Sequence, residues 1–254
     1  MFEDIEITQW KTIVIFGTLA ALFVFERIYP ATIWLGGLNR MGRNFGLAGF
    51  NAVLSPLIVL PLAQFADASS LDWRPDSWAS SWMIAADLLV LDLWIYWWHR
   101  FNHAVPFLWR FHEVHHLDDT LDSTSALRFH FGEVVLSSLV RATVIIVLDV
   151  PFTSVVVFET LVMLSALFHH SNIRLPLWLE KPLSFLIVTP KIHWVHHHAF
   201  RPDTDSNYSA ILSVWDRVFG SASLTQRTPD MAVGVEGLKD RGIIGLLLRP
   251  FRLR

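Results

Sequence analysis

Three short groups of histidine carry the most specific chemical signal in this sequence. Their members recur at steps of three and four residues, and they are His99, His103, His112, His115, His116, His193, His196 and His197. On a helix these steps return to the same face, so each group predicts one edge of a metal site. Neutral imidazole is a common ligand of transition metals, and the chain has no cysteine that could supply thiolate.

The four remaining histidines lie close to these groups, because all 12 histidines fall between His99 and His198. His170 in "FHHSN" and His130 in "RFHFGE" are candidates for additional ligands. His169 lies on a different helix face from its neighbour, and His198 follows a complete motif. We expect these last two to brace the site or to face solvent.

Apolar runs must carry and position the histidine groups. They cover residues 11–29, 45–66, 81–98, 134–150 and 151–168. Several are short for a bilayer crossing, which needs about 20 helical residues. Pro56 and Pro61 predict a kink in the second run, and Pro151 predicts a turn between the last two. With 53% hydrophobic residues, the composition predicts an all-α integral membrane protein of about four transmembrane helices or helical hairpins.

The chain has no long linker rich in Gly, Ser or Pro, which predicts a single domain over residues 1–254. Within it we expect N-terminal helices at 1–80, a histidine-bearing core at 81–220 and a tail at 221–254. The segment 175–187 is typical of an interfacial helix, and the basic, apolar end at 242–254 could rest on anionic lipid.

Charge predicts the orientation in the membrane. The loop at residues 65–80 is acidic, whereas the segment 99–128 carries Arg100, Arg110 and Arg128. By the positive-inside rule the N-terminus lies outside, and the histidine-rich segments form a helical cap on the cytoplasmic side. The net charge of −3 provides no basic surface for nucleic acid, so we exclude that class of partner.

The number of ligands predicts more than one metal ion. A structural zinc site takes four ligands, and the three groups alone supply eight imidazoles, which is enough for two ions with room for an exogenous ligand. Ligand type leaves iron, zinc, copper and nickel open. The position beside apolar helices favours iron, because oxygen chemistry on an unactivated lipid C–H bond needs a redox metal.

The order of the motifs resembles the fatty acid hydroxylase/sterol desaturase superfamily of membrane diiron enzymes. The resemblance covers roughly residues 88–220, in the segments "HRFNH", "FHEVHH", "LRFHFGE", "FHHSNIRLP", "HWVHHH", "DSNY" and "WDRVFG". It implies a helical membrane domain capped by a cytoplasmic centre with two iron ions, which activates the co-substrate O₂ and oxidises a lipid C–H bond. By position, it implies that the eight histidines of the three groups are the core ligands, with His170 and His130 as additional candidates.

Polar residues near the motifs are candidates to orient the ligands by hydrogen bonding to ring N–H groups. They are Asp92, Tyr96, Asn172, Asp205 and Asn207, of which Asp92 and Tyr96 share the helical stripe of His99. Two other acids, Glu113 and Asp118, are expected to be exposed charges on a helix face. We expect Trp215, Asp216 and Arg217 to form a structural turn that caps the site.

These observations favour an O₂-dependent diiron oxidoreductase that hydroxylates or desaturates a fatty acyl, sterol or related membrane lipid. No flavin, haem or ferredoxin motif is present, so the electrons must come from an external reductase with a ferredoxin or a cytochrome b5-like carrier. Arg40, Arg43, Arg201 and Arg227 could help to dock an acidic carrier, although a solvated cytoplasmic surface is the simpler explanation. Two alternatives stay open: a membrane metal-binding protein without oxygenase activity, and an enzyme of ether lipids like alkylglycerol monooxygenase.

Overall fold

Every regular element in the described part of the chain is helical. The computed structural model describes residues 2–33, 36–75 and 81–252, so the last part of the acidic loop, 76–80, lies outside it. Within these ranges there is no strand, only three isolated bridges. The prediction of an all-α protein is confirmed.

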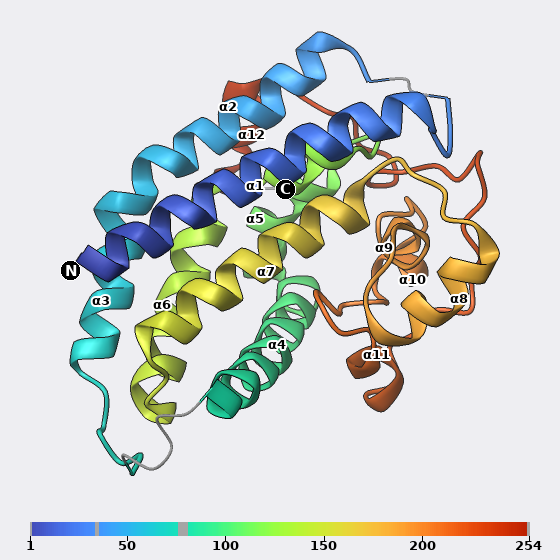
Figure 1. Cartoon of the computed structure of the whole chain (residues 1–254). Helices are drawn as coiled ribbons and strands as arrows, with labels where there is room; N and C mark the ends of the chain where they lie inside the picture. Colours follow the sequence, from blue (N-terminus) through green and yellow to red (C-terminus); the bar gives the residue numbers. More distant parts are fainter. Residues whose placement is uncertain (1, 34–35, 76–80, 253–254) are drawn as a thin grey trace.

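Five long helices, together with the shorter α3, form the body of the protein. They are α1 (Phe2–Ile28), α2 (Leu38–Leu54), α3 (Leu60–Ala68), α4 (Ser81–Ala104), α6 (Phe131–Leu148) and α7 (Phe152–His170). In Figure 1, α1 runs along α7, α3 lies against α6, and α4 crosses next to α7. A buried apolar cluster centred on Leu91, Ile145 and Phe158 joins α4, α6 and α7.

Three helical segments in the described residues are long and apolar enough to cross a membrane. They are Leu38–Ala68, Phe131–Leu148 and Phe152–His170. The first buries only 11% of its apolar window against the rest of the protein, as expected for a helix whose neighbours are lipid chains. The predicted run at 11–29 ends one residue beyond α1, and the run at 81–98 lies within α4; these two helices are not among the three segments.

Proline interrupts the long helices where the sequence predicts. Between α2 and α3 the helix continues through a π-helical turn, Ser55–Val59, that contains Pro56. This follows from the missing N–H of proline, which removes a backbone hydrogen bond inside a helix. Between α6 and α7, Asp149 adopts a left-handed conformation with φ of 52°, and Pro151 caps the next helix.

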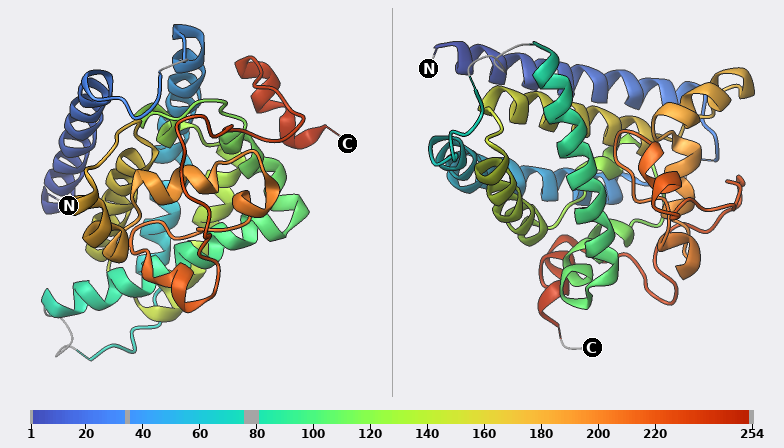
Figure 2. Two further views of the ribbon diagram at one scale, coloured as in Figure 1. Left: turned by 90° about the vertical axis from the view of Figure 1, so that its right-hand side faces the viewer. Right: turned by 90° about the horizontal axis from the view of Figure 1, so that it is seen from below.

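Short helices gather at one end of the body. They are α5 (Pro106–His116), α8 (Leu177–Leu186), α9 (Pro190–His196), α10 (Arg201–Thr204), α11 (Val214–Val218) and α12 (Ile243–Leu247), with 3₁₀ turns at Ser123–Leu127 and Arg249–Phe251. Two further views show α9 to α11 grouped beyond the ends of the long helices (Figure 2). The histidines lie where the two parts meet, near the C-terminal ends of α4, α5, α7 and α9.

The two peripheral segments differ in how far they follow expectation. The segment 175–187 contains α8, whose Trp178 and Phe185 are exposed as an interfacial helix would require. In the tail, which the structure describes as far as residue 252, Leu246 is fully buried in a cluster with Leu47 and Val114, whereas Ile244 and Phe251 stay exposed. The sequence could not reveal this partner, because the contact joins segments more than a hundred residues apart.

Candidate metal centre

Nine imidazoles converge into two adjacent groups in the described part of the chain. The first group is His99, His103, His112, His116 and His196, and the second is His115, His170, His193 and His197. Within each group, one ring nitrogen from every member lies within 4.8 Å of the others. The structure therefore brings together all eight histidines of the three sequence groups, and adds His170.

Each H-x-x-H-H motif divides its members between the two groups. His112 and His116, one helical turn apart on α5, belong to the first group, whereas His115 turns toward the second. On α9, His193 belongs with His197 in the second group, and His196 belongs to the first. Each motif is therefore an edge that the two groups share, because adjacent helical positions differ in direction by about 100°. Each of the two motifs thus links the first group to the second through the backbone of one short helix.

Local sequence places these helices at the required angles. Pro106 begins α5 immediately after α4 ends at Ala104, because proline suits the first turn of a new helix but cannot continue an old one. Pro190 begins α9 in the same way. Both short helices therefore start abruptly and bring their C-terminal histidines under the ends of α4 and α7.

Burial keeps the cluster neutral. Removal from water, reinforced by the neighbouring imidazoles, holds the pKa values of His115, His116, His193, His196 and His197 well below the ordinary value. Neutral imidazole is the form that binds metal.

Hydrogen bonds fix which ring nitrogen carries the proton in six of the nine histidines. Four Nδ1 atoms face backbone carbonyl oxygens: His99 faces Tyr208 at 2.8 Å, His115 faces Arg128 at 3.2 Å, and both His170 (to Ala166) and His196 (to Ser206) form contacts of 2.7 Å. Two face carboxylates: His103 faces Asp205 at 3.2 Å and His112 faces Glu133 at 2.8 Å. These oxygens only accept, so Nδ1 donates and Nε2 is left with its lone pair.

The Nε2 atoms meet each other at distances that neutral imidazoles alone cannot explain. His99 and His112 approach to 3.1 Å, and so do His115 and His170. Since all four rings donate through Nδ1, each pair brings two lone pairs face to face, which is repulsive unless a cation lies between them. Two nitrogens bound to one ion at about 2.1 Å and at roughly a right angle would be about 3 Å apart.

Unpartnered nitrogens support the same conclusion. The Nε2 atoms of His103 and His196, and both nitrogens of His116, are buried without a hydrogen-bond partner in the structure. Buried polar atoms are ordinarily satisfied, and an orphaned one calls for a ligand. The residues present therefore fit two metal ions, with five imidazoles around one and four around the other.

Three other histidines lie outside both groups. His130 uses both ring nitrogens, one near Leu247 O at 3.0 Å and the other accepting from Gly132 N at 3.0 Å, so it has no nitrogen free for a metal. This corrects its assignment as an additional ligand. His198 pairs with Asp203 at 2.7 Å. His169 packs its ring 3.9 Å from that of His193, centroid to centroid, without joining either group.

Of the residues expected to orient the ligands, one contacts a histidine through its side chain. That residue is Asp205, the partner of His103. Asp92 instead accepts from Ile211 N, Leu212 N and Trp215 Nε1, and the Tyr96 hydroxyl pairs with Ser221. These two residues hold the segment 211–221, which includes α11, and neither contacts a histidine ring through a hydrogen bond that the structure shows.

The two asparagines hold the backbone rather than a ring. Asn172 bonds to the backbone of Thr32 through its amide, and Asn207 donates to Ile192 O and accepts from Ser223 N. The expectation for the 215–217 turn holds at Asp216, which is buried and accepts from Tyr208 N and Ser209 N. Through Tyr208, this turn reaches His99.

Glu133 is the functional residue that sequence reasoning missed. It is only 6% exposed, lies in the first turn of α6 and accepts from His112 Nδ1. The available signal was its place at the end of "RFHFGE", where a carboxylate opens an otherwise apolar helix. A charge in such a position needs a partner, which here is a ligand of the first group.

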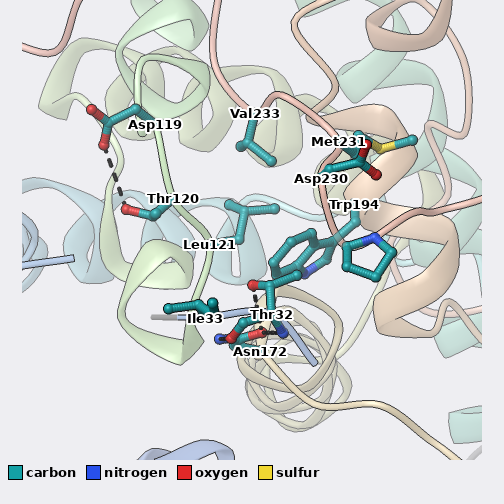
Figure 3. A pocket seen from close by; sticks show the side chains of 11 residues that line it. Thr32, Ile33, Asp119, Thr120, Leu121, Asn172, Trp194, Asp230, Met231 and Val233 are labelled. Carbon is teal, nitrogen blue, oxygen red and sulfur yellow. Dashed lines mark hydrogen bonds between the residues drawn. The ribbon is translucent and has the colours of Figure 1, made fainter. Parts of the chain in front are cut away.

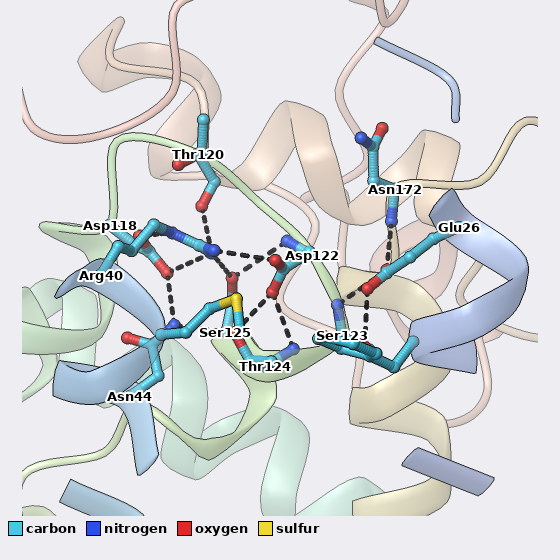
Figure 4. Close-up of polar contacts among 12 residues, drawn as sticks. Glu26, Arg40, Asn44, Asp118, Thr120, Asp122, Ser123, Thr124, Ser125 and Asn172 are labelled. Atoms are coloured by element: carbon cyan, nitrogen blue, oxygen red, sulfur yellow. Dashed lines mark hydrogen bonds and ion pairs between the residues drawn. The ribbon is translucent and has the colours of Figure 1, made fainter. Parts of the chain in front are cut away.

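Two acids expected on an exposed helix face are buried. Glu113 is 1% exposed and accepts from Arg249 at 2.6 Å, and Asp118 is fully buried. Arg40, expected at a solvated surface, binds Asp118 and Asp122 with its guanidinium fork (Figure 4). Planar bidentate pairing suits arginine and a carboxylate. This network connects α2 to the segment that follows α5, and so helps to hold His116 and the rest of α5 in place.

The fold and the histidine cage define a class: helical membrane proteins with two groups of histidines beside apolar helices that could each hold a metal ion. Residues 84–221 match the sequence model of the fatty acid hydroxylase family, and the chain belongs to that family. The matched region contains all nine clustered histidines.

Relatives with named activities support the family assignment. The chain is 25% identical to an ornithine lipid hydroxylase of Rhizobium tropici, over 95% of this chain and 76% of that protein. It is 29% identical to the alkylglycerol monooxygenase of Homo sapiens over 57% of this chain, but spans only 31% of that protein. It is 31% identical to a cholesterol 25-hydroxylase-like protein of Danio rerio, over 59% of this chain and 62% of that protein. No solved structure matches.

Proposed function

We propose that this protein is a diiron monooxygenase that uses O₂ to hydroxylate a C–H bond of a membrane lipid. The observation that carries the proposal is the pair of imidazole groups, whose facing lone pairs call for two cations. Membership of a hydroxylase family, and relatives named as lipid hydroxylases, favour hydroxylation over desaturation.

When bound, two iron ions would supply the redox chemistry and the oxygen activation that no side chain can provide. The chain's own residues hold the ligands still: Tyr208 O, Glu133 and Asp205 accept hydrogen bonds from Nδ1–H groups, which keeps each proton on Nδ1 and prevents a change of tautomer. The histidines of the cage are buried, so bulk water is excluded from it and reactions with water are suppressed.

The stoichiometry of the hydroxylation shows which partner proteins the reaction needs. One oxygen atom of O₂ enters the lipid as a hydroxyl group and the other leaves as water, which consumes two electrons and two protons. An external reductase, acting through a ferredoxin or a cytochrome b5-like carrier, supplies the electrons. The excess of arginine near the cage supports placing it on the cytoplasmic side of a multi-pass protein.

Ornithine lipid is the first substrate to test, because the relative named for it aligns with nearly the whole chain. Ether lipids are the second, on the weaker ground that the alkylglycerol monooxygenases match only 57% of it.

The test measures metal and product together. The full-length protein, purified in lipid nanodiscs, should contain close to two iron atoms per chain by mass spectrometry. With a reductant and ¹⁸O₂ it should add one labelled oxygen to a membrane lipid, and a His112→Gln variant should lose both properties. The proposal is contradicted if the protein contains zinc in place of iron, or if an iron-loaded, reduced protein forms no labelled lipid.

A further inference from the structure

The C-terminal segment, residues 239–252, has a docked face that fixes its orientation. Its helix α12 packs on α2, where Leu246 is fully buried in one cluster with Leu47. Gly46 lets the two helices approach closely, because a Cβ at this position would overlap Cδ1 of Ile243. The C-terminal segment therefore lies beside α2 about two turns from the start of that helix.

Polar contacts hold the same face of the C-terminal segment. Leu247 O lies 3.0 Å from His130 Nε2, and Arg249 donates to Glu113 at 2.6 Å. His130 caps the start of α6 and Glu113 lies on α5, so the segment contacts three helices of the protein. The side chains on its other face must then point outward.

The chain is also held by the protein just before this segment. Residues 229–233 form one wall of an open pocket of about 380 Å³, in which Figure 3 shows Val233 near Leu121. Gly234 N then donates to His197 O at 3.1 Å. The C-terminal segment thus starts from a fixed point and is not a loose end.

The outward face of the C-terminal segment is apolar. Ile244 is 71% exposed, Leu248 is 47% exposed and Phe251 is 62% exposed, all within α12 and the 3₁₀ turn that follows it. Large apolar side chains that gather on an exposed surface mark a place of contact with another molecule or with a membrane.

This apolar face continues the surface of the apolar segment Leu38–Ala68, which is long enough to cross a membrane. On that segment the exposed Phe50 packs its ring 5.5 Å from that of Phe131, centroid to centroid. The ring of Phe131 lies 4.4 Å from that of His130, which in turn lies 6.0 Å from that of Phe251. A lipid layer around α2 would therefore extend along these four rings to the C-terminal segment.

The charges that flank the apolar face are basic. The C-terminal segment contains four cations and one acid. The acid, Asp240, is paired with arginines from other parts of the chain, whereas Lys239, Arg241 and Arg252 are exposed. Apolar side chains beside exposed basic residues are typical of a segment that lies at the surface of an anionic membrane.

We propose that residues 239–252 form an interfacial anchor that inserts its exposed apolar side chains beside α2 and binds the phosphate groups of anionic lipids. The apolar side chains enter the boundary between headgroups and acyl chains, and Arg241 and Arg252 pair with lipid phosphates. The anchor needs a membrane but neither a metal ion nor turnover, so it stands independently of the proposed function.

The first test measures contact between the anchor and lipid. Because the chain has no cysteine, the variants Ile244→Cys and Phe251→Cys can each carry a single fluorescent label in the full-length protein, embedded in nanodiscs. Lipids with brominated acyl chains should quench both labels, because an interfacial segment buries its apolar face about 5–10 Å into the bilayer boundary. A label on Phe45→Cys, next to Gly46 on α2, is the positive control, and a label on the exposed Gln226→Cys should not be quenched.

The second test measures the preference for anionic lipid. In bilayers with equal amounts of phosphatidylglycerol and phosphatidylcholine, of which only one is brominated, the label on Ile244→Cys should meet phosphatidylglycerol more often. Arg241→Gln/Arg252→Gln should lower this preference about fivefold or more, which is the contribution of one basic residue near an anionic surface. Arg174→Gln/Lys181→Gln removes two exposed cations outside the anchor and should leave the preference unchanged. The thermal midpoint of each variant in micelles shows whether its fold is intact.

Each outcome decides the proposal. Labels on Ile244→Cys and Phe251→Cys that stay unquenched overturn the anchor, and disulfide cross-links between chains through the same cysteines would then assign this face to a second copy of the chain. Equal quenching by the two lipids, or a preference that survives in Arg241→Gln/Arg252→Gln, overturns the recognition of anionic lipid. A protein that shows both effects but never oxidises lipid retains the anchor and loses only the proposed function.

Discussion

The contact between Glu133 and His112 offers the sharpest test of the metal centre. The Nδ1···Oε1 distance is 2.8 Å and Glu133 is only 6% exposed, so this is a charge-assisted bond in a poorly hydrated place. Loss of such an outer partner typically lowers metal affinity by about 10- to 100-fold. We therefore expect Glu133→Ala to weaken iron binding by about 1.4 to 2.8 kcal/mol.

Glu133→Gln separates charge from hydrogen bonding. Glutamine keeps an acceptor oxygen within reach of His112 Nδ1 but carries no charge. The iron affinity of Glu133→Gln should therefore fall between the affinities of the wild type and of Glu133→Ala. The affinity is measured by competition against a chelator, with iron counted by mass spectrometry. Glu236→Ala, at an exposed position, is the control.

The reasoning fails if Glu133→Ala binds iron as tightly as Glu236→Ala. It also fails if alanine and glutamine lose affinity equally, because the acceptor would then have no role in orienting His112. Thermal unfolding of the metal-free proteins shows how much of any loss comes from the fold alone.

Three further predictions concern residues around the cage. Arg40→Met removes the nearest cation from two buried carboxylates, Asp118 and Asp122, and should lower the free energy of unfolding by about 3 to 5 kcal/mol, read from chemical denaturation in micelles. Burial raises the pKa of Asp240, but Arg128 and Arg43 outweigh this effect and hold the pKa below its ordinary value of 3.8. The stabilisation that these ion pairs give the folded protein is therefore complete above about pH 4 and is lost as the pH falls through the lowered pKa. The stability difference between wild type and Asp240→Asn should therefore vanish in acid. His130→Gln should keep its iron, whereas His115→Gln should lose it.

Each of these has an outcome that contradicts it. Arg174→Met, at an exposed arginine, should cost little, and a similar cost at Arg40 would show that the buried network does not stabilise the fold. A stability difference at Asp240 that grows in acid would reverse the sign derived from its pKa. Loss of iron from His130→Gln would restore that histidine as a ligand.

The sequence by itself determined the chemistry of the centre. Spacing of three and four residues is a local property of a helix, so the histidines of "HEVHH" and "HWVHHH" could be assigned to shared helix faces without a structure. The number of imidazoles then predicted more than one ion, and the absence of cysteine excluded thiolate ligands. Apolar runs and prolines likewise predicted the helices and their breaks, because both act within a few residues.

Only the tertiary structure decided how the ligands are shared and held. It divided His115 from His116 and His196 from His197, since neighbouring helical positions point to different partners across the cage. It also supplied Glu133 and Tyr208 to the ring nitrogens from segments 21 and 109 residues away. Hydrogen bonds at such separations depend on how helices pack, and no local pattern in the chain encodes that packing.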